Sequence, residues 1–361
     1  MHTARSLALG AVVLLASQAA RAQTAEVKTA EQVYKNIVQL KGTPADQLPA
    51  AMQFISVSLG VDCAFCHVDG KPEADDKNAK KTARSMIAMQ MAINKDSFRG
   101  RTQVTCYSCH RGATNPTAVP PVLESDAAVA PRPPAPTPPT AGAPAAPTAD
   151  QIVEKYIAAV GGADAIHKVT SRVLKGTILA MGSETPTDIL TKAPNKRVSI
   201  THRGASNSYT AFDGTMGWMG SDTSARDMAA TDSAGYALDA EFYLPTRLKE
   251  LFPQLRRGRP ETVNGADCEV LSGTTASHIQ VRMDFAKDSG LLVRLVRLTE
   301  NPLGRMPVEI DYADYRDDGA GVKIPFRLTL ERPGGRFSTQ IKEVQTNVPI
   351  DDAKFAKPAA K

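Results

Sequence analysis

The sequence contains few of the features that mark membrane proteins or common hydrolases. Beyond its first 22 residues, the 361-residue chain has no apolar run long enough to cross a bilayer. It has no Ser-His-Asp arrangement, no phosphate-binding glycine loop and no paired-carboxylate pattern. The chain has only five cysteines and six histidines. Few positions can therefore supply a thiol or an imidazole for metal binding, cofactor attachment or catalysis.

The N-terminus has the pattern of a secretory signal peptide. Arg5 supplies the charged start, residues 7–16 form the apolar stretch, and Ala20-Arg21-Ala22 is a cleavage site. The apolar stretch is short for a membrane span, and no cysteine lies near the cleavage point to carry a lipid. The sequence therefore predicts cleavage near Ala22 and a periplasmic location, with an uncleaved anchor as the alternative.

Composition divides the rest of the chain into three parts. Residues 23–113 have helical periodicity and contain four of the five cysteines. Residues 114–148 contain eleven prolines, and such a segment forms an extended, semi-rigid linker because it cannot build a core. Residues 149–361 alternate apolar and polar side chains. We therefore expect a signal peptide (1–22), a helical domain, a linker and a β domain.

Three helices are predicted in the helical domain from the spacing of apolar residues. The first opens near Thr29 and places Val33, Ile37 and Leu40 on one face. The second covers residues 48–59 and ends at Gly60, which suits a left-handed cap. The third covers residues 82–94.

Two copies of the C-x-x-C-H motif lie in this domain, at Cys63-Ala64-Phe65-Cys66-His67 and Cys106-Tyr107-Ser108-Cys109-His110. On a helical turn the two cysteines of a motif face one side and can form thioethers with the vinyl groups of a haem. The histidine that follows can bind the iron. The motifs therefore predict two covalent haems c, attached at Cys63, Cys66, Cys106 and Cys109 and ligated by His67 and His110.

The charge of the chain argues against a nucleic-acid partner. The formal net charge is +5. Residues 23–115 contain twelve basic and nine acidic side chains, and the propionates of two haems would bring this domain near or below neutral. A basic patch for phosphate binding is therefore not predicted.

The sixth iron ligands are restricted by a shortage of histidine. After signal cleavage, the helical domain has no histidine outside the two motifs, but it has Met52, Met86, Met89 and Met91. Methionines at helical spacing commonly fill cores, and this is the alternative for all four. Met52 lies eleven residues before Cys63, on a helix that leads into the motif. For the second haem, spacing leaves the other three methionines open.

These stretches resemble the cytochrome c subunit of purple-bacterial photosynthetic reaction centres. The resemblance is carried by residues 52–67, 83–89 and 104–112 and covers residues 28–115. In that family a helix with a Met ligand precedes each attachment helix. The resemblance implies Met52 as ligand of the first haem, Met86 as ligand of the second, and a packing role for Met89. It includes two of the family's four haems.

The second domain begins with a predicted helix over residues 150–160. Alternation then follows at residues 279–285, 308–312 and 324–330, with turn signals between the runs. This pattern predicts a curved antiparallel sheet with one apolar face, a half-barrel with helices. Phe212-Asp213-Gly214-Thr215-Met216-Gly217-Trp218 and residues 347–352 resemble the periplasmic lipoprotein-carrier (Lol-type) superfamily. That resemblance implies a hydrophobic ligand such as a lipid or quinone; a closed core without ligand is the alternative.

The sequence thus predicts a periplasmic electron carrier with two His/Met-ligated haems, and not an enzyme. Its partners would be periplasmic redox proteins or a membrane electron-transfer complex, such as the reaction centre that the resemblance implies. A dihaem peroxidase is the enzymatic alternative, and a haem-based sensor or carrier is a third possibility.

Overall fold

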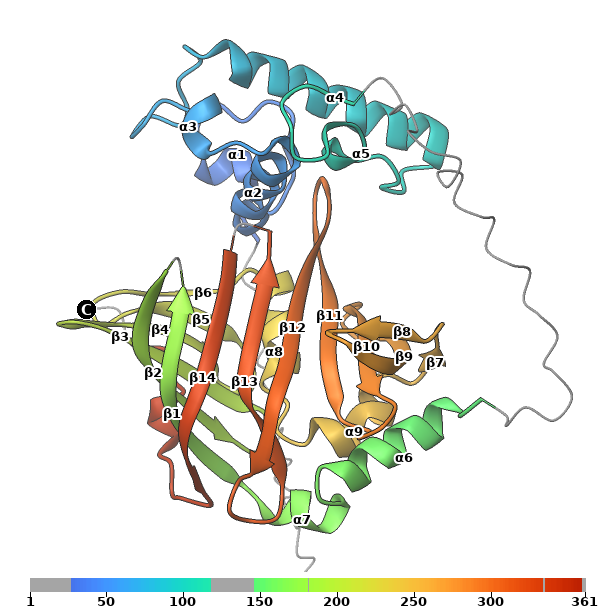
Figure 1. Cartoon of the computed structure of the whole chain (residues 1–361). Coiled ribbons are helices and arrows are strands. Elements are labelled where there is room, and N and C mark those ends of the chain that lie inside the picture. Colours follow the sequence, from blue (N-terminus) through green and yellow to red (C-terminus); the bar gives the residue numbers. More distant parts are fainter. Residues whose placement is uncertain (1–26, 118–145, 181, 334, 359–361) are drawn as a thin grey trace, which may run out of the picture.

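The computed structural model describes residues 27–117, 146–180, 182–333 and 335–358. These residues form a helical domain (27–117) and a β domain (146–358), shown in Figure 1. The predicted signal peptide and most of the predicted linker lie outside the described residues.

The helical domain consists of short helices around one long one. Its elements are α1 (Ala30–Val33), η1 (Ala45–Gln47), α2 (Leu48–Leu59), α3 (Cys63–Cys66), α4 (Asn78–Phe98) and α5 (Cys106–His110).

The structure agrees with the second predicted helix and differs at the other two. Helix α2 has the predicted bounds and ends at Gly60, whose φ of 67° is easy for a residue without Cβ. Helix α4 extends beyond the predicted 82–94 at both ends. The first prediction is wrong in length: α1 ends at Val33 because Tyr34 is extended and Asn36 takes a positive φ of 59°.

The β domain consists of a single antiparallel sheet and several helices. The helices are α6 (Ala149–Ala159), α7 (Ala163–Lys168), α8 (Ala230–Asp239), α9 (Leu244–Leu251) and the short η3 (Asp352–Lys354). The strands are β1 (Ser171–Ala180), β2 (Ser183–Lys192), β3 (Lys196–Arg203), β4 (Ser206–Phe212), β5 (Gly217–Ser221), β6 (Ala225–Asp227), β7 (Arg256–Arg257), β8 (Glu261–Val263), β9 (Ala266–Thr274), β10 (Gln280–Ala286), β11 (Leu292–Asn301), β12 (Gly304–Asp317), β13 (Lys323–Arg332) and β14 (Gly335–Thr346).

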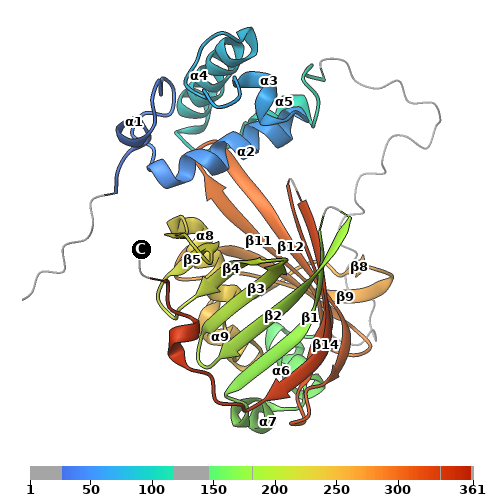
Figure 2. The ribbon, with the colours of Figure 1, turned by 90° about the vertical axis from the view of Figure 1, so that its left-hand side faces the viewer.

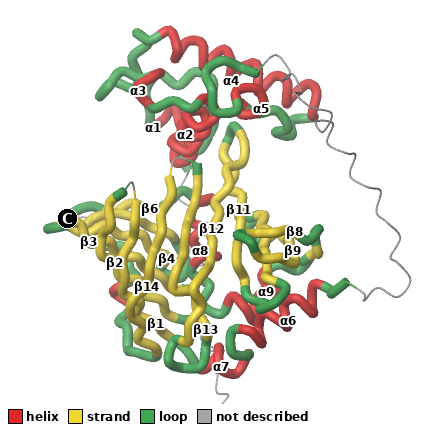
Figure 3. The backbone as a smooth tube through the Cα atoms, viewed as in Figure 1, coloured by secondary structure: helices red, strands yellow, loops and turns green. Residues whose placement is uncertain are grey.

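The sheet is an open meander, as the alternation predicts. Its strand order is β6-β5-β4-β3-β2-β1-β14-β13-β12-β11-β10-β9-β7, with β8 paired to β9. Sequence neighbours pair along most of the sheet; the exceptions are β7, which pairs with β9, and β1, which pairs with β14. The pairing of the first strand with the last joins the two halves of the meander. Figures 2 and 3 show how the sheet curves around α8 and α9.

The concave side holds the main core of the β domain. Phe252, Leu271 and Met283 are among its fully buried side chains, and residues of α6, α8 and α9 pack there against β9–β11. On the opposite face of β3–β5, the C-terminal segment covers Trp218, with Phe355 fully buried beside it. The sheet therefore buries apolar side chains on both faces.

Candidate haem-binding sites

The first motif forms a single helical turn, α3, at the surface of the helical domain. The Oδ1 of Asp62 caps the turn by accepting a hydrogen bond from the backbone N of Phe65 at 3.0 Å. Cys63 is exposed and Cys66 is half-buried, and burial raises the pKa of the Cys66 thiol. Both cysteines lie on this one turn, three residues apart, which is the spacing that two thioethers to one haem require.

The imidazole of His67 is oriented by a backbone carbonyl. Its Nδ1 lies 2.8 Å from the carbonyl oxygen of Pro72. A carbonyl oxygen can only accept a hydrogen bond, so Nδ1 must carry the proton. The lone pair of Nε2 is then available for a metal, in the arrangement common for metal-bound histidines.

The loop that supplies this carbonyl is held against α4 by the buried Lys80. Its Nζ donates to the carbonyl oxygens of Pro72 and Ala74, at 2.8 Å each, and lies 3.1 Å from Oδ1 of Asp75. Arg84 donates to the other oxygen of Asp75 at 2.9 Å. The hydrogen bond from Arg84 is the main reason why the pKa of Asp75 lies well below its usual value.

The second motif forms the helix α5 and repeats the same chemistry. Thr105 caps it, with its backbone N donating to Oγ of Ser108 at 3.0 Å. Nδ1 of His110 lies 3.0 Å from the carbonyl oxygen of Ala113, so this ring also presents Nε2 as the free ligand atom. Burial raises the pKa of the Cys106 thiol.

The segment before Cys106 is attached to α4 by the buried side chain of Asn94. Its Oδ1 accepts from the backbone N of Gln103 and of Val104, at 2.9 Å each, and its Nδ2 donates to the Val104 carbonyl at 2.7 Å. Gln90 donates to the same carbonyl at 2.9 Å. Sequence reasoning missed both residues, although Gln90 and Asn94 share the face of α4 that buries Ile87.

A close glycine contact brings the end of α2 to the end of α5. The backbone N of Gly112 donates to the carbonyl of Ser58 at 2.9 Å. A Cβ at Gly60 would lie 2.1 Å from the carbonyl oxygen of Gly112, so only glycine fits there. The residues that flank the first motif therefore also support the second. Met52 and Cys106 pack against the same apolar cluster, to which α2 contributes Leu48, Ala51, Phe54 and Ile55.

The other candidate methionines are exposed side chains on α4. Met86, Met89 and Met91 are 39%, 48% and 44% exposed, so exposure does not distinguish them. Among the described residues, nine of the eleven exposed large hydrophobic side chains belong to this domain, namely Val27, Val33, Tyr34, Val38, Phe65, Met86, Met89, Met91 and Tyr107. This apolar surface and the Cys/His/Met donor set suit covalently attached porphyrins.

Residues 6–132, which include both motifs, match the family model of the photosynthetic reaction centre cytochrome C subunit. The helical domain is similar to this subunit. The photosynthetic reaction center cytochrome c subunit of Thermochromatium tepidum is 36% identical over 87 residues, which are 23% of this chain and 22% of that protein. The subunit of Rubrivivax gelatinosus is 32% identical over 100 residues, 25% of this chain and 27% of that protein. The chain thus spans about a quarter of the length of these relatives.

The solved structures similar to this chain include a LolA superfamily protein from Nitrosomonas europaea. Its sequence identity is 15% and its TM-score 0.40, over 59% of this chain and 99% of that protein.

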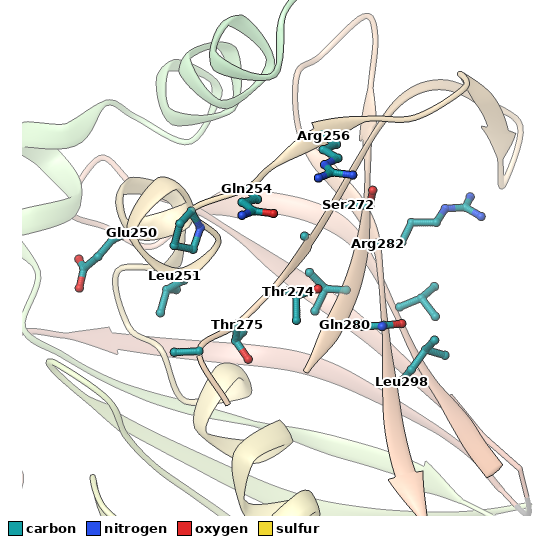
Figure 4. A pocket seen from close by; sticks show the side chains of 15 residues that line it. Glu250, Leu251, Gln254, Arg256, Ser272, Thr274, Thr275, Gln280, Arg282 and Leu298 are labelled. Atoms are coloured by element: carbon teal, nitrogen blue, oxygen red, sulfur yellow. The ribbon is translucent and has the colours of Figure 1, made fainter. Parts of the chain in front are cut away.

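The β domain has an open pocket of about 770 Å³ beside the end of α9 (Figure 4). Its polar lining includes Arg256, Arg282 and Gln280, and its apolar lining includes Leu251 and Leu298. The guanidinium of Arg282 is paired with Glu261 and Asp284.

In the part of the chain that the structure describes, no helix is long and apolar enough to cross a membrane.

Proposed function

We propose that this protein is an exported electron-transfer cytochrome that carries two covalent haems c. The observation that carries the proposal is the matched geometry of the two motifs. In each, Nδ1 of the histidine donates a hydrogen bond to a backbone carbonyl, which leaves the lone pair of Nε2 for a metal, and the two cysteines lie on the same short helix, three residues apart. The family match spans both motifs.

When bound, a haem c supplies one-electron oxidation and reduction at its iron. Cys63 and Cys66 would hold one haem by thioethers, and Cys106 and Cys109 the other. Nε2 of His67 and of His110 would each bind an iron, kept in position by the Pro72 and Ala113 carbonyls. The thioether sulfurs of Met52 and Met86 are the proposed sixth ligands, and thioether ligation raises the reduction potential relative to bis-histidine ligation.

The first test is the haem content of the exported protein. Peptide mass analysis of the mature chain should find one haem on the peptide with Cys63 and one on the peptide with Cys106, and a new N-terminus at Gln23. A chain without covalent haem would refute the proposal. Retention of Met1 would refute only the cleaved signal peptide.

The ligand assignment is tested by methionine substitutions. Met52→Ala and Met86→Ala should each remove the Met–iron charge-transfer absorption of one haem, whereas Met89→Ala and Met91→Ala should leave both. Because Met52 and Cys106 pack against the same apolar cluster, the affected haem should be assigned in each variant. Loss of the absorption in Met89→Ala would move the second ligand to that residue.

The electron-carrier proposal is separated from a dihaem peroxidase by exogenous ligands. Iron with both axial positions filled by protein binds carbon monoxide slowly, whereas a peroxidase needs an open or labile position. Rapid binding of carbon monoxide to the reduced protein, with peroxide turnover, would favour the enzyme.

We propose periplasmic redox proteins as partners, and a membrane electron-transfer complex as the partner that the resemblance implies.

A hydrophobic ligand for the β domain is a separate proposal. The pocket near α9 supports it by combining Leu251 and Leu298 with the basic Arg256, which suits an amphiphile with an acidic head. The filled core on the concave side supports the closed alternative instead. Native mass spectrometry of the purified protein decides between them: a co-purifying lipid or quinone is expected for the ligand, and its absence together with failure to bind lipid probes contradicts it.

A further inference from the structure

The hairpin formed by β11 and β12 reaches beyond the sheet and contacts the helical domain (Figures 1 and 2). Asn301 pairs with Gly304, so Pro302 and Leu303 form a two-residue tip. Leu303 is fully buried. The apolar cluster that buries it consists otherwise of residues from the helical domain, which are Ala30, Leu40, Leu48, Ala51, Phe54, Ile55 and Ile87. An apolar residue at a hairpin tip loses all its exposure only when another surface covers it.

Gly304 lies between two elements of the helical domain, where only a residue without a side chain has room. A Cβ on this residue would lie 2.7 Å from Cζ of Phe54 and 3.1 Å from Cγ2 of Thr105. Phe54 lies on α2, which carries Met52, and Thr105 is the cap of α5, directly before Cys106. The tip therefore touches both helices at their junction.

Two further contacts connect the same domains. Nε2 of Gln53, on α2, donates to the carbonyl of Pro333 in the β13–β14 turn at 2.9 Å. Oδ2 of Asp46 lies 3.4 Å from the backbone N of Ala230, at the start of α8. The β domain thus contacts the helical domain through the hairpin tip, the β13–β14 turn and the start of α8. Of these three segments, only the hairpin tip enters the apolar cluster in the described part of the chain.

We propose that the β11–β12 tip is a positioning element for the second haem site. It keeps α2 and α5 at a fixed separation and excludes water from their junction, so that the β domain sets the reduction potential of the haem attached at Cys106 and Cys109. The inference rests on the proposed function, since it needs a haem at that motif. Its physical basis is that water stabilises the more highly charged oxidised iron, so loss of apolar cover lowers the potential.

The test uses the mature full-length holoprotein and two variants of different kinds. Leu303→Ser removes the buried apolar side chain, and Gly304→Val adds bulk where Phe54 and Thr105 leave no space. Leu179→Ser is the matched control, because this leucine is also near the end of a strand but is 48% exposed. Hydrogen exchange of the amides of α2 and α5 reports docking, and a spectroelectrochemical titration reports the two potentials.

We expect exchange at the α2–α5 junction at least about tenfold faster in both variants, and a lower potential for one haem while the other is unchanged. The shifted haem is assigned in a full-length form with Cys63→Ser and Cys66→Ser, in which only the second motif is loaded. The control should match the parent protein.

Three results would overturn the inference. Unchanged exchange in both variants would show that the tip does not hold the helices. Faster exchange with unchanged potentials, or a shift of the haem at Cys63, would refute its role at the second site. If no haem is attached at all, the proposed function fails together with the claim about potential, while the exchange data still decide whether the tip docks.

Discussion

Lys80 and His67 share one acceptor: Nζ of the lysine and Nδ1 of the histidine each lie 2.8 Å from the carbonyl oxygen of Pro72. The two residues come from different elements, α4 and the end of the first motif. Their common partner ties the orientation of a proposed iron ligand to the position of the longest helix in the domain.

Replacing Lys80 should therefore loosen the first haem site. Lys80→Met removes the hydrogen bonds to Pro72 and Ala74 and should lower the free energy of unfolding by about 1–3 kcal/mol. Urea denaturation followed at the Soret band measures it. The control is Lys81→Met, because Lys81 is exposed on the same helix. Equal stability of the two variants would contradict the role of Lys80.

Asp75 should make the stability of the helical domain depend on pH below neutrality. Its folded-state pKa is lowered, chiefly by the hydrogen bond from Arg84. Such a group stabilises the fold above its unfolded pKa of about 3.9, and this contribution is lost as the pH falls through the folded pKa. Asp75→Asn should be less stable than the parent at pH 7, with the difference shrinking as the pH falls below about 4. Denaturation at several pH values measures this. Asp76→Asn, at an exposed neighbour, should show no such convergence.

Asn94 and Gln90 should differ in their importance for the second motif. Asn94→Ala removes the acceptor of the half-buried Val104 N–H and one of the two acceptors of the Gln103 N–H, which keeps the Arg101 carbonyl. This should cost about 1–3 kcal/mol. Gln90→Met should cost less than about 1 kcal/mol, because Val104 keeps its bond from Asn94 and the Gln90 Oε1 is already buried without a partner among the described residues. Thermal unfolding of the holoprotein compares them. The reverse order of stabilities would refute the assignment of Asn94 as the main attachment.

The C-terminal segment should stabilise the β domain through Phe355. This side chain is fully buried, and its carbonyl accepts a hydrogen bond from Nε1 of Trp218 at 2.7 Å. Phe355→Ala should cost about 3–5 kcal/mol and expose the indole. Trp218 is the only tryptophan of the chain, so its emission should shift to the red while circular dichroism follows unfolding. Lys354→Ala, at an exposed neighbour, should leave both signals unchanged.

The sequence by itself determined the features that depend on local spacing. Three-residue spacing places Cys63 and Cys66 on one turn, helical periodicity with Gly60 delimits α2, and two-residue alternation predicts the antiparallel sheet. The first helix failed because its apolar spacing continues through Leu40, whereas the backbone turns at Asn36 and lets Leu40 reach the core from a loop.

Only the tertiary structure decided which partners these elements meet. The carbonyl that orients His67, the approach of Gly60 to Gly112, and the pairing of β1 with β14 involve residues joined by loops or separated by most of a domain. The burial of Leu303 in the helical domain joins residues more than two hundred positions apart. No periodic pattern encodes such contacts, because they arise from how complementary surfaces exclude water once the separate elements have formed.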